Sequence, residues 1–98
     1  MNLKNAHNIY FIGIGGIGMS ALAHYFVAHG KNVAGFDRAQ TKITSSLEDA
    51  GVGIHYKDSI DLISNEFKDK SKTLIVYTPA ISETHSELSY FRSNDFQI

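Results

Sequence analysis

The chain has 98 residues, of which 43% are hydrophobic and 19% charged, and its formal net charge is −1. This composition excludes wholesale disorder, and the length allows one small domain. A near-neutral charge argues against broad electrostatic binding of nucleic acid, which requires clustered positive charge. Because the chain contains no cysteine, disulfide frameworks, thiolate metal sites and cysteine nucleophiles are excluded.

The sequence shows neither a membrane-spanning stretch nor a secretory signal. No segment reaches the ~18 consecutive apolar residues of a transmembrane helix. Residues 1–8 lack the apolar run of a signal peptide. Met1 is therefore interpreted as a genuine start, and we expect a cytoplasmic protein without membrane or nucleic-acid partners.

Strand and helix patterns alternate along the first half of the chain. Residues 9–14 form a short apolar run, typical of a strand buried on both faces. Apolar residues then recur at helical spacing over 19–27, before Gly30 at the expected helix end. Residues 32–37 predict a second strand, and Thr41 is expected to cap a second helix.

The second half continues the alternation. Residues 52–56 predict a weaker strand, and Asp58 is expected to cap a short helix after it. Residues 73–77 predict another buried strand. The tetrapeptide Thr-His-Ser-Glu at 84–87 matches a capping box for a final helix. Residues 95–98 are typical of a fifth strand that is just beginning.

This order of elements predicts an α/β fold. Parallel strands joined by helices take right-handed crossovers, which place helices on both faces of the sheet. We expect a Rossmann-like, doubly wound, three-layer fold with a parallel sheet of about five strands. Because the chain stops inside an apolar element, it is interpreted as the N-terminal fragment of a longer protein.

A glycine-rich loop carries the strongest functional signal. Gly13, Gly15 and Gly18 match G-x-G-x-x-G between a strand and a helix, a context in which the helix N-terminus binds a diphosphate. Gly13 is expected to permit the tight turn, Gly15 to admit a ligand, and Gly18 to allow close helix–strand packing. Asp37 ends the second strand, where a carboxylate commonly accepts hydrogen bonds from a nucleoside; a helix cap or solvated turn residue is the alternative.

Other candidate residues give weaker signals. Residues 78–81 follow a strand at the same sheet edge, so ligand contact and simple strand termination are both open. Five histidines show no metal-like spacing, and we expect surface or helix-end positions for all of them. They are His7, His24, His29, His55 and His85.

The glycine segment at 10–20, YFIGIGGIGMS, resembles the Mur ligases of peptidoglycan synthesis, especially in its double glycine and Gly-Met-Ser ending. Residues 33–37 resemble the family's V-x-G-S-D, although Phe36 replaces the usual serine. Residues 77–81 resemble its S-S-A-I or T-P-A-I segment, and Ile17 stands where a smaller residue is common. The likeness runs in order along essentially the whole chain.

The resemblance implies a three-domain ligase of which residues 1–98 are the N-terminal, UDP-sugar-binding domain. That domain would hold the UDP part of UDP-N-acetylmuramate. The central domain would use ATP and Mg²⁺ to phosphorylate the lactyl carboxylate, and the amine of L-alanine would then attack the acyl phosphate. Catalysis would therefore lie outside this chain, which would need no cofactor of its own.

Carried over residue by residue, the resemblance implies substrate contacts but no catalytic or metal-binding residue. Gly13 would serve the turn. The assigned contacts are Gly15, Gly16, Ile17 and Gly18 for the diphosphate, Asp37 and Arg38 for the uridine, and Thr78, Ala80 and Ile81 for the border of diphosphate and sugar.

Two other function classes remain open. The cofactor half of an NAD-dependent dehydrogenase would share the glycine pattern and Asp37, although it does not require Gly16 or the Met19-Ser20 continuation. A non-catalytic nucleotide-sensing module, such as the regulatory domain of a transporter, would also share them. A downstream G-x-x-x-x-G-K-[ST] phosphate loop in the full gene would favour the ligase.

Overall fold

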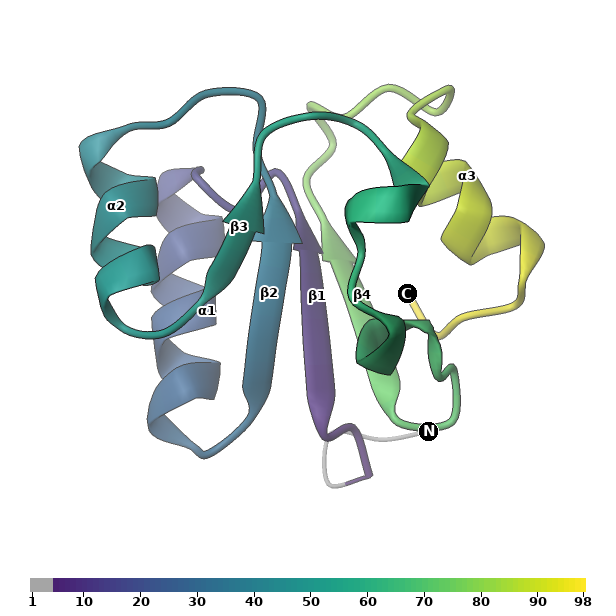
Figure 1. Ribbon diagram of the computed structural model, residues 1–98, viewed down its shortest axis with the longest axis horizontal. Helices are drawn as coiled ribbons and strands as arrows, with labels where there is room; N and C mark the ends of the chain where they lie inside the picture. The colour runs from purple at the N-terminus through teal and green to yellow at the C-terminus, as the bar shows by residue number, and fades with distance from the viewer. Residues whose placement is uncertain (1–4) are drawn as a thin grey trace.

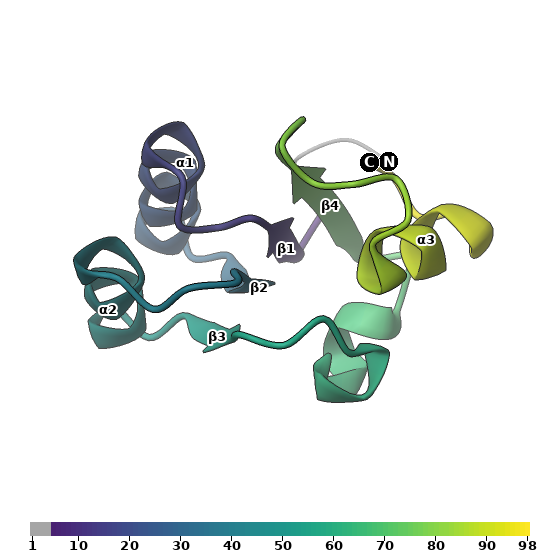
Figure 2. The ribbon, with the colours of Figure 1, turned by 90° about the horizontal axis from the view of Figure 1, so that it is seen from above.

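A computed structural model describes residues 5–98 as a parallel sheet between two helical layers (Figures 1 and 2). The interpretation of Met1 concerns a residue outside this range. The sheet has the order β3-β2-β1-β4 and consists of β1 (Asn8–Ile12), β2 (Asn32–Phe36), β3 (Gly53–His55) and β4 (Thr73–Tyr77). The doubly wound α/β prediction is confirmed.

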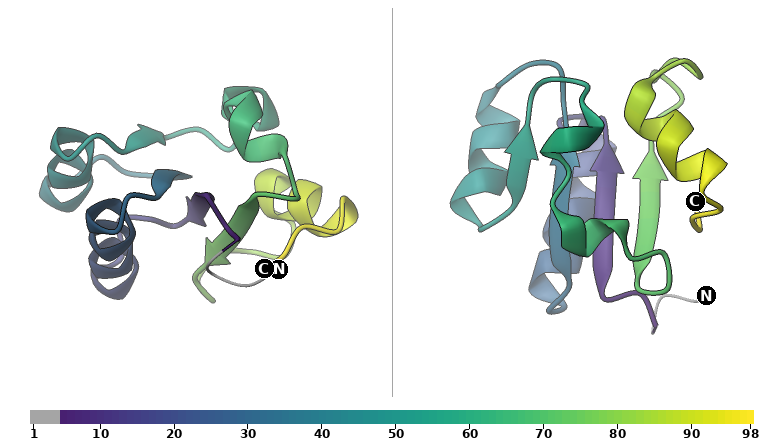
Figure 3. Two further views of the ribbon diagram at one scale, coloured as in Figure 1. Left: turned by 90° about the horizontal axis from the view of Figure 1, so that it is seen from below. Right: turned by 45° about the vertical axis from the view of Figure 1, so that its right-hand side comes forward.

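The two helical layers cover opposite faces of the sheet, as the views along the strands show (Figure 2; Figure 3, left). One layer contains α1 (Ile17–Ala28) and α2 (Lys42–Asp49). The other contains two short 3₁₀ helices, η1 (Ile60–Leu62) and η2 (Asn65–Lys68), together with α3 (Ser86–Ser93). In the right panel of Figure 3 this second layer lies in front of the sheet.

The sheet has four strands rather than the five that were expected. Gln97 forms a single parallel bridge with Leu74, and its carbonyl accepts a hydrogen bond from Ile75 N–H at 2.9 Å. One bridge is not a ladder, so residues 95–98 reach the edge of β4 without forming a strand with it.

Strand β1 lies at the centre of the fold and is buried along its whole length. Its side chains alternate between the two faces, as the two-residue period of a strand requires. Phe11 packs in the core beneath α1 and α2, whereas Tyr10 packs in the core beneath η2 and α3. The short apolar run at the start of the sequence therefore joins two separate cores.

The predicted cap of α2 is confirmed. Thr41 is its N-cap residue, and the Thr41 hydroxyl accepts a hydrogen bond from Thr44 N–H at 3.3 Å. In return, the Thr44 hydroxyl accepts one from Thr41 N–H at 2.8 Å. This reciprocal pair satisfies two backbone donors at the helix start, and such a cap contributes about 1 kcal/mol.

Two other capping predictions are wrong. Asp58 does not cap the element after it; its carboxylate accepts from Ser86 N–H at 2.8 Å and Glu87 N–H at 3.1 Å, at the start of α3. The capping box at 84–87 does not form, because His85 is the N-cap residue and its side chain makes no capping hydrogen bond. Local pattern rules cannot detect a cap that is supplied from 28 residues away.

The buried carboxylate of Glu87 ties α3 to the sheet. It accepts from the Tyr10 hydroxyl at 2.5 Å and from Ser59 N–H at 3.1 Å, and it lies 2.7 Å from His55 Nε2. Burial and this carboxylate raise the pKa of Tyr10 above its ordinary value. The surface or helix-end position expected for His55 is therefore wrong, because the side chain of His55 is drawn into this cluster.

The helices of residues 5–98 are too short or too polar to cross a membrane.

Candidate functional site

A cavity of about 510 Å³ opens at the carboxyl edge of the sheet, the edge that faces the viewer in Figure 2. Three segments meet there: the loop from β1 to α1, the turn after β2 and the loop from β4 to α3. The predicted residues that line the cavity are Gly13, Gly16, Asp37, Arg38, Thr78, Ala80 and Ile81. Gly15 belongs to the β1–α1 loop, and Ile17 and Gly18 belong to the first turn of α1, but none of the three is part of the lining.

Two walls bound this cavity. We call residues 13–18 with 36–38 the glycine-loop wall, and residues 78–85 the β4–α3 wall. A second hollow of about 650 Å³ lies near Lys70 and Gln97, close to the amino end of β4. Because ligands of open α/β sheets bind outside the carboxyl ends of the strands, the 510 Å³ cavity is the candidate site.

Gly13 makes the sharp turn that brings the glycine-loop wall together. Its φ is +90°, a left-handed conformation that side chains other than glycine disfavour. Gly13 N–H donates to the Phe36 carbonyl at 2.8 Å, which ties the end of β1 to the end of β2. A Cβ at Gly13 would lie 2.6 Å from Thr78 Cγ2. This geometry matches the tight-turn role expected for Gly13.

Gly15 admits a carboxylate of the chain itself. Its N–H donates to Asp37 Oδ2 at 2.8 Å, and a Cβ there would lie 2.8 Å from the same oxygen. Asp37 Oδ1 accepts a second hydrogen bond, from Ala39 N–H at 3.2 Å. Asp37 is thus oriented by two backbone amides, and a carboxylate with about four acceptor positions can still receive ligand donors.

The packing role expected for Gly18 is wrong. No atom lies within 4 Å of the position of a Cβ at Gly18, so the helix and strand do not meet there. The residue lies on the outer side of the first turn of α1, next to Ile17, which is 83% exposed. In this chain the third glycine of the G-x-G-x-x-G pattern, Gly18, therefore does not mark a close contact between helix and strand.

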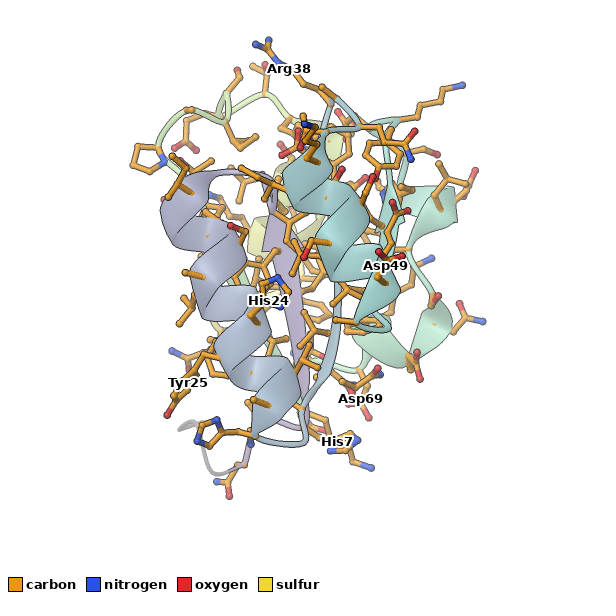
Figure 4. The ribbon with its side chains drawn as sticks, turned by 90° about the vertical axis from the view of Figure 1, so that its left-hand side faces the viewer. His7, His24, Tyr25, Arg38, Asp49 and Asp69 are labelled. Carbon is orange, nitrogen blue, oxygen red and sulfur yellow. The ribbon has the colours of Figure 1, made fainter. Side chains whose placement is uncertain are left out.

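The amino end of α1 gives the cavity a preference for anions. Gly16 is the N-cap residue without a side-chain cap, and the first turn contains no acidic residue. The first amides of a helix lack intrahelical acceptors and carry the positive end of its dipole. Arg38 adds a positive charge at the rim, where its side chain extends away from the sheet edge (Figure 4). A diphosphate fits this set of donors.

The β4–α3 wall begins with a turn after β4. Ile81 N–H donates to the Thr78 carbonyl at 3.0 Å, and Ala80 N–H lies 3.4 Å from the Thr78 hydroxyl. The turn sets Thr78 and Ile81 against the cavity, opposite Gly13. Residues 78–81 therefore do more than end a strand, since they form part of the lining.

His85 and Ser82 also line the cavity, and sequence reasoning assigned neither to the ligand. The His85 side chain is 10% exposed, and its ring meets Phe36 edge-on with centroids 4.7 Å apart. The only sequence signal for His85 was its position in the segment before the last helix. The capping-box interpretation drew attention to its neighbours instead. The helix-end position expected for His85 is confirmed, whereas His7, His24 and His29 are exposed.

Comparison with known proteins connects this geometry to a family. The model of a family described as "Mur ligase family, catalytic domain" matches residues 8–98. The UDP-N-acetylmuramate–L-alanine ligase of Phocaeicola vulgatus is 49% identical over 98 residues, which are the whole of this chain and 21% of that protein. The same-named ligase of Flavobacterium psychrophilum is also 49% identical over the whole chain and 22% of its own length.

Solved structures agree with the sequence comparison. The UDP-N-acetylmuramate-alanine ligase of Thermotoga maritima superposes with a TM-score of 0.80 at 33% identity, over 93% of this chain and 20% of that one. A murein peptide ligase of Psychrobacter arcticus gives a TM-score of 0.77 at 25% identity, over 94% of this chain and 18% of that one. The chain spans about a fifth of the length of the curated relatives that it matches.

Proposed function

The chain belongs to the Mur ligase family, and on that premise we propose that residues 1–98 form the N-terminal domain that binds the UDP part of UDP-N-acetylmuramate. The observation that carries the proposal is the cavity at the carboxyl edge, where the amino end of α1 and the Asp37 carboxylate meet. A role in peptidoglycan synthesis follows from the family and from the names of its relatives.

We assign the diphosphate to the amino end of α1. Backbone amides of Gly16, Ile17 and Gly18 would donate to it, favoured by the helix dipole. Gly15 contributes differently from the expectation, because its amide already donates to Asp37. Its role is then to fix the Asp37 carboxylate at the cavity, because that carboxylate fills the space beside Gly15.

The nucleoside and the sugar take the rest of the cavity. Asp37 would accept hydrogen bonds from ribose hydroxyls or from the uracil N–H, and Arg38 would close over the uridine from the rim. The β4–α3 wall, through Thr78, Ala80 and Ile81, would border the diphosphate and the sugar. Phe36 supplies an aromatic surface where the family usually has a serine hydroxyl.

We propose no site for ATP, Mg²⁺ or L-alanine among the residues of this chain. The 98 residues contain no G-x-x-x-x-G-K-[ST] phosphate loop, and no group of three metal-ligating side chains occurs within residues 5–98. We propose that these ligands bind other parts of the ligase, where the chemistry takes place, and that the enzyme works in the cytoplasm. This domain then positions the substrate.

Titration calorimetry of the chain with UDP-N-acetylmuramate, UDP and NAD⁺ tests the proposal. We expect measurable binding of the two uridine ligands and weaker binding of NAD⁺, because the proposed assignment gives the cavity one diphosphate and one nucleoside. Tighter binding of NAD⁺ than of either uridine ligand would favour a dehydrogenase cofactor domain instead.

A further inference from the structure

The His85 side chain makes no capping hydrogen bond at the start of α3, although it belongs to the N-cap residue. The capping acceptor is Asp58, whose carboxylate receives both Ser86 N–H and Glu87 N–H, at 2.8 and 3.1 Å. The helix start is therefore satisfied without the imidazole. That ring is 10% exposed and lies against the cavity.

The imidazole has hydrogen-bonding capacity that the chain leaves unused. Both ring nitrogens are buried, and neither has a hydrogen-bond partner within residues 5–98. Nδ1 lies 3.3 Å from Asp58 Oδ1, close enough for a charge contact if the ring is protonated, but not aligned as a hydrogen bond. Since buried polar groups are nearly always hydrogen-bonded, this ring is an exception at the wall of a candidate site.

The surroundings of the ring indicate what kind of group it meets. Phosphates are drawn to the amino end of α1, at Gly16, by the helix dipole. Near His85 the wall is instead aromatic, because its ring meets Phe36 edge-on at 62°. A planar group with an apolar face and hydrogen-bonding edges suits such a wall. A nucleobase has this chemistry, whereas an inorganic anion does not.

We infer that His85 is a further specificity-determining residue of this cavity, and that its imidazole hydrogen-bonds the base of the nucleoside diphosphate whose phosphates lie at α1. The inference rests on the proposed function, since it assumes that ligand. Neither ring nitrogen holds a hydrogen bond in the free chain, so the ring can turn towards the ligand at the expense of only the 3.3 Å contact between Nδ1 and Asp58.

Calorimetry on the His85→Phe variant tests the inference, with UDP and inorganic pyrophosphate as ligands. Phenylalanine keeps an aromatic ring against Phe36 and removes both nitrogens, together with the contact between Nδ1 and Asp58. We expect UDP affinity to fall about tenfold, the usual effect of one lost hydrogen bond, with pyrophosphate affinity unchanged. His24→Phe, on the exposed face of α1 (Figure 4), is the matched control and should change neither.

Unchanged UDP affinity in a folded His85→Phe chain would overturn the inference, and so would an equal loss of affinity for both ligands. If the variant fails to fold, the ring ¹⁵N resonances of His85 in the wild-type chain provide the test. They should shift on addition of UDP and stay in place with pyrophosphate; no shift at saturating UDP would overturn the inference. A wild-type chain that binds no UDP would instead defeat the proposed function itself.

Discussion

The two walls of the cavity are built in different ways. The glycine-loop wall is held within one β-α-β unit by backbone amides that donate to the end of β2, Gly13 N–H to the Phe36 carbonyl at 2.8 Å and Gly15 N–H to the Asp37 carboxylate at 2.8 Å. The β4–α3 wall depends on α3, which is fixed by side chains from distant parts of the chain. Asp58 is 28 residues from the amide it caps, and Tyr10 is 77 residues from Glu87.

This difference shows that one site combines a single β-α-β unit with a network that spans the chain. The glycine-loop wall requires only the pairing of β1 with β2, since its two contacts join the β1–α1 loop to the end of β2. The β4–α3 wall forms only after the sheet has assembled, because Glu87 bonds to residues of β1 and of the β3–η1 connection. Substitution of Glu87, behind the β4–α3 wall, should therefore lower stability. Substitutions in the glycine-loop wall should change stability at Gly13 and ligand binding at Asp37.

The largest effect is expected from Glu87→Ala, which breaks the network behind the β4–α3 wall. The Tyr10 hydroxyl and Ser59 N–H would lose their acceptor. Breaking a buried charged network typically costs 3–5 kcal/mol, and we expect a loss of about that size in the free energy of unfolding by urea denaturation. Glu83→Ala, in an exposed pair with Arg92, should change stability by less than about 1 kcal/mol. Equal losses would refute the network.

Gly13→Ala addresses the glycine-loop wall and should cost about 2–3 kcal/mol. An alanine at φ +90° is strained, and its Cβ would lie 2.6 Å from Thr78 Cγ2. Thermal or urea unfolding measures the loss. A variant as stable as the wild type would show that the turn relaxes without cost, and the wall would then not be as rigid as described.

Asp37→Ala separates nucleoside recognition from phosphate binding within the same wall. Losing a charge-assisted hydrogen bond costs about 1.5–3 kcal/mol, or roughly ten- to a hundredfold in affinity. We expect UDP binding to weaken by this factor in calorimetry, while pyrophosphate binding hardly changes. If Asp37 serves only the turn at Ala39 and Gly15, the melting temperature should fall and both ligands should weaken together.

The network behind α3 should also respond to alkaline pH. Burial and the Glu87 carboxylate raise the pKa of Tyr10 above 10.0. Its stabilising contribution is therefore complete below about pH 10 and is lost as the pH rises further, by up to ~1.4 kcal/mol per pH unit. Urea unfolding at several pH values should show this slope, and Tyr10→Phe should reduce it. Tyr25→Phe, at a ring that is 53% exposed, should leave the slope unchanged.

The smallest effect, and one of opposite sign, is expected from Gly18→Ala. A Cβ at this position meets no atom within 4 Å, and alanine is favoured over glycine in a helix by about 0.5–1 kcal/mol. The variant should be slightly more stable in urea and should still bind UDP. A destabilised variant would restore the packing role that the glycine pattern first suggested for Gly18.

The sequence was sufficient for features that depend on neighbouring residues. The alternation of strands and helices, the Thr41 cap and the turn at Gly13 all follow from local rules, and the structure has them. The convergence of Asp37 with the segment at 78–81 also follows, because the carboxyl ends of parallel strands meet at one edge.

The features that sequence reasoning missed depend on contacts between distant residues. Asp58 was assigned to the wrong helix, and the tetrapeptide at 84–87 matched a capping box whose glutamate is instead buried against Tyr10. His85 was missed for the same reason, since only the folded chain brings its ring against Phe36. A fifth strand was predicted from four residues, although Gln97 forms only one bridge.

The central claim is that both walls of the carboxyl-edge cavity bind one nucleoside diphosphate, and NMR shift mapping with UDP tests it most directly. The account predicts saturable amide shifts in the α1 amino end at 16–19 and in the β4–α3 wall at 78–85. Amides near Lys70 and Gln97, beside the hollow at the amino end of β4, should stay unchanged. Shifts confined to that hollow, or to one wall alone, would contradict the account.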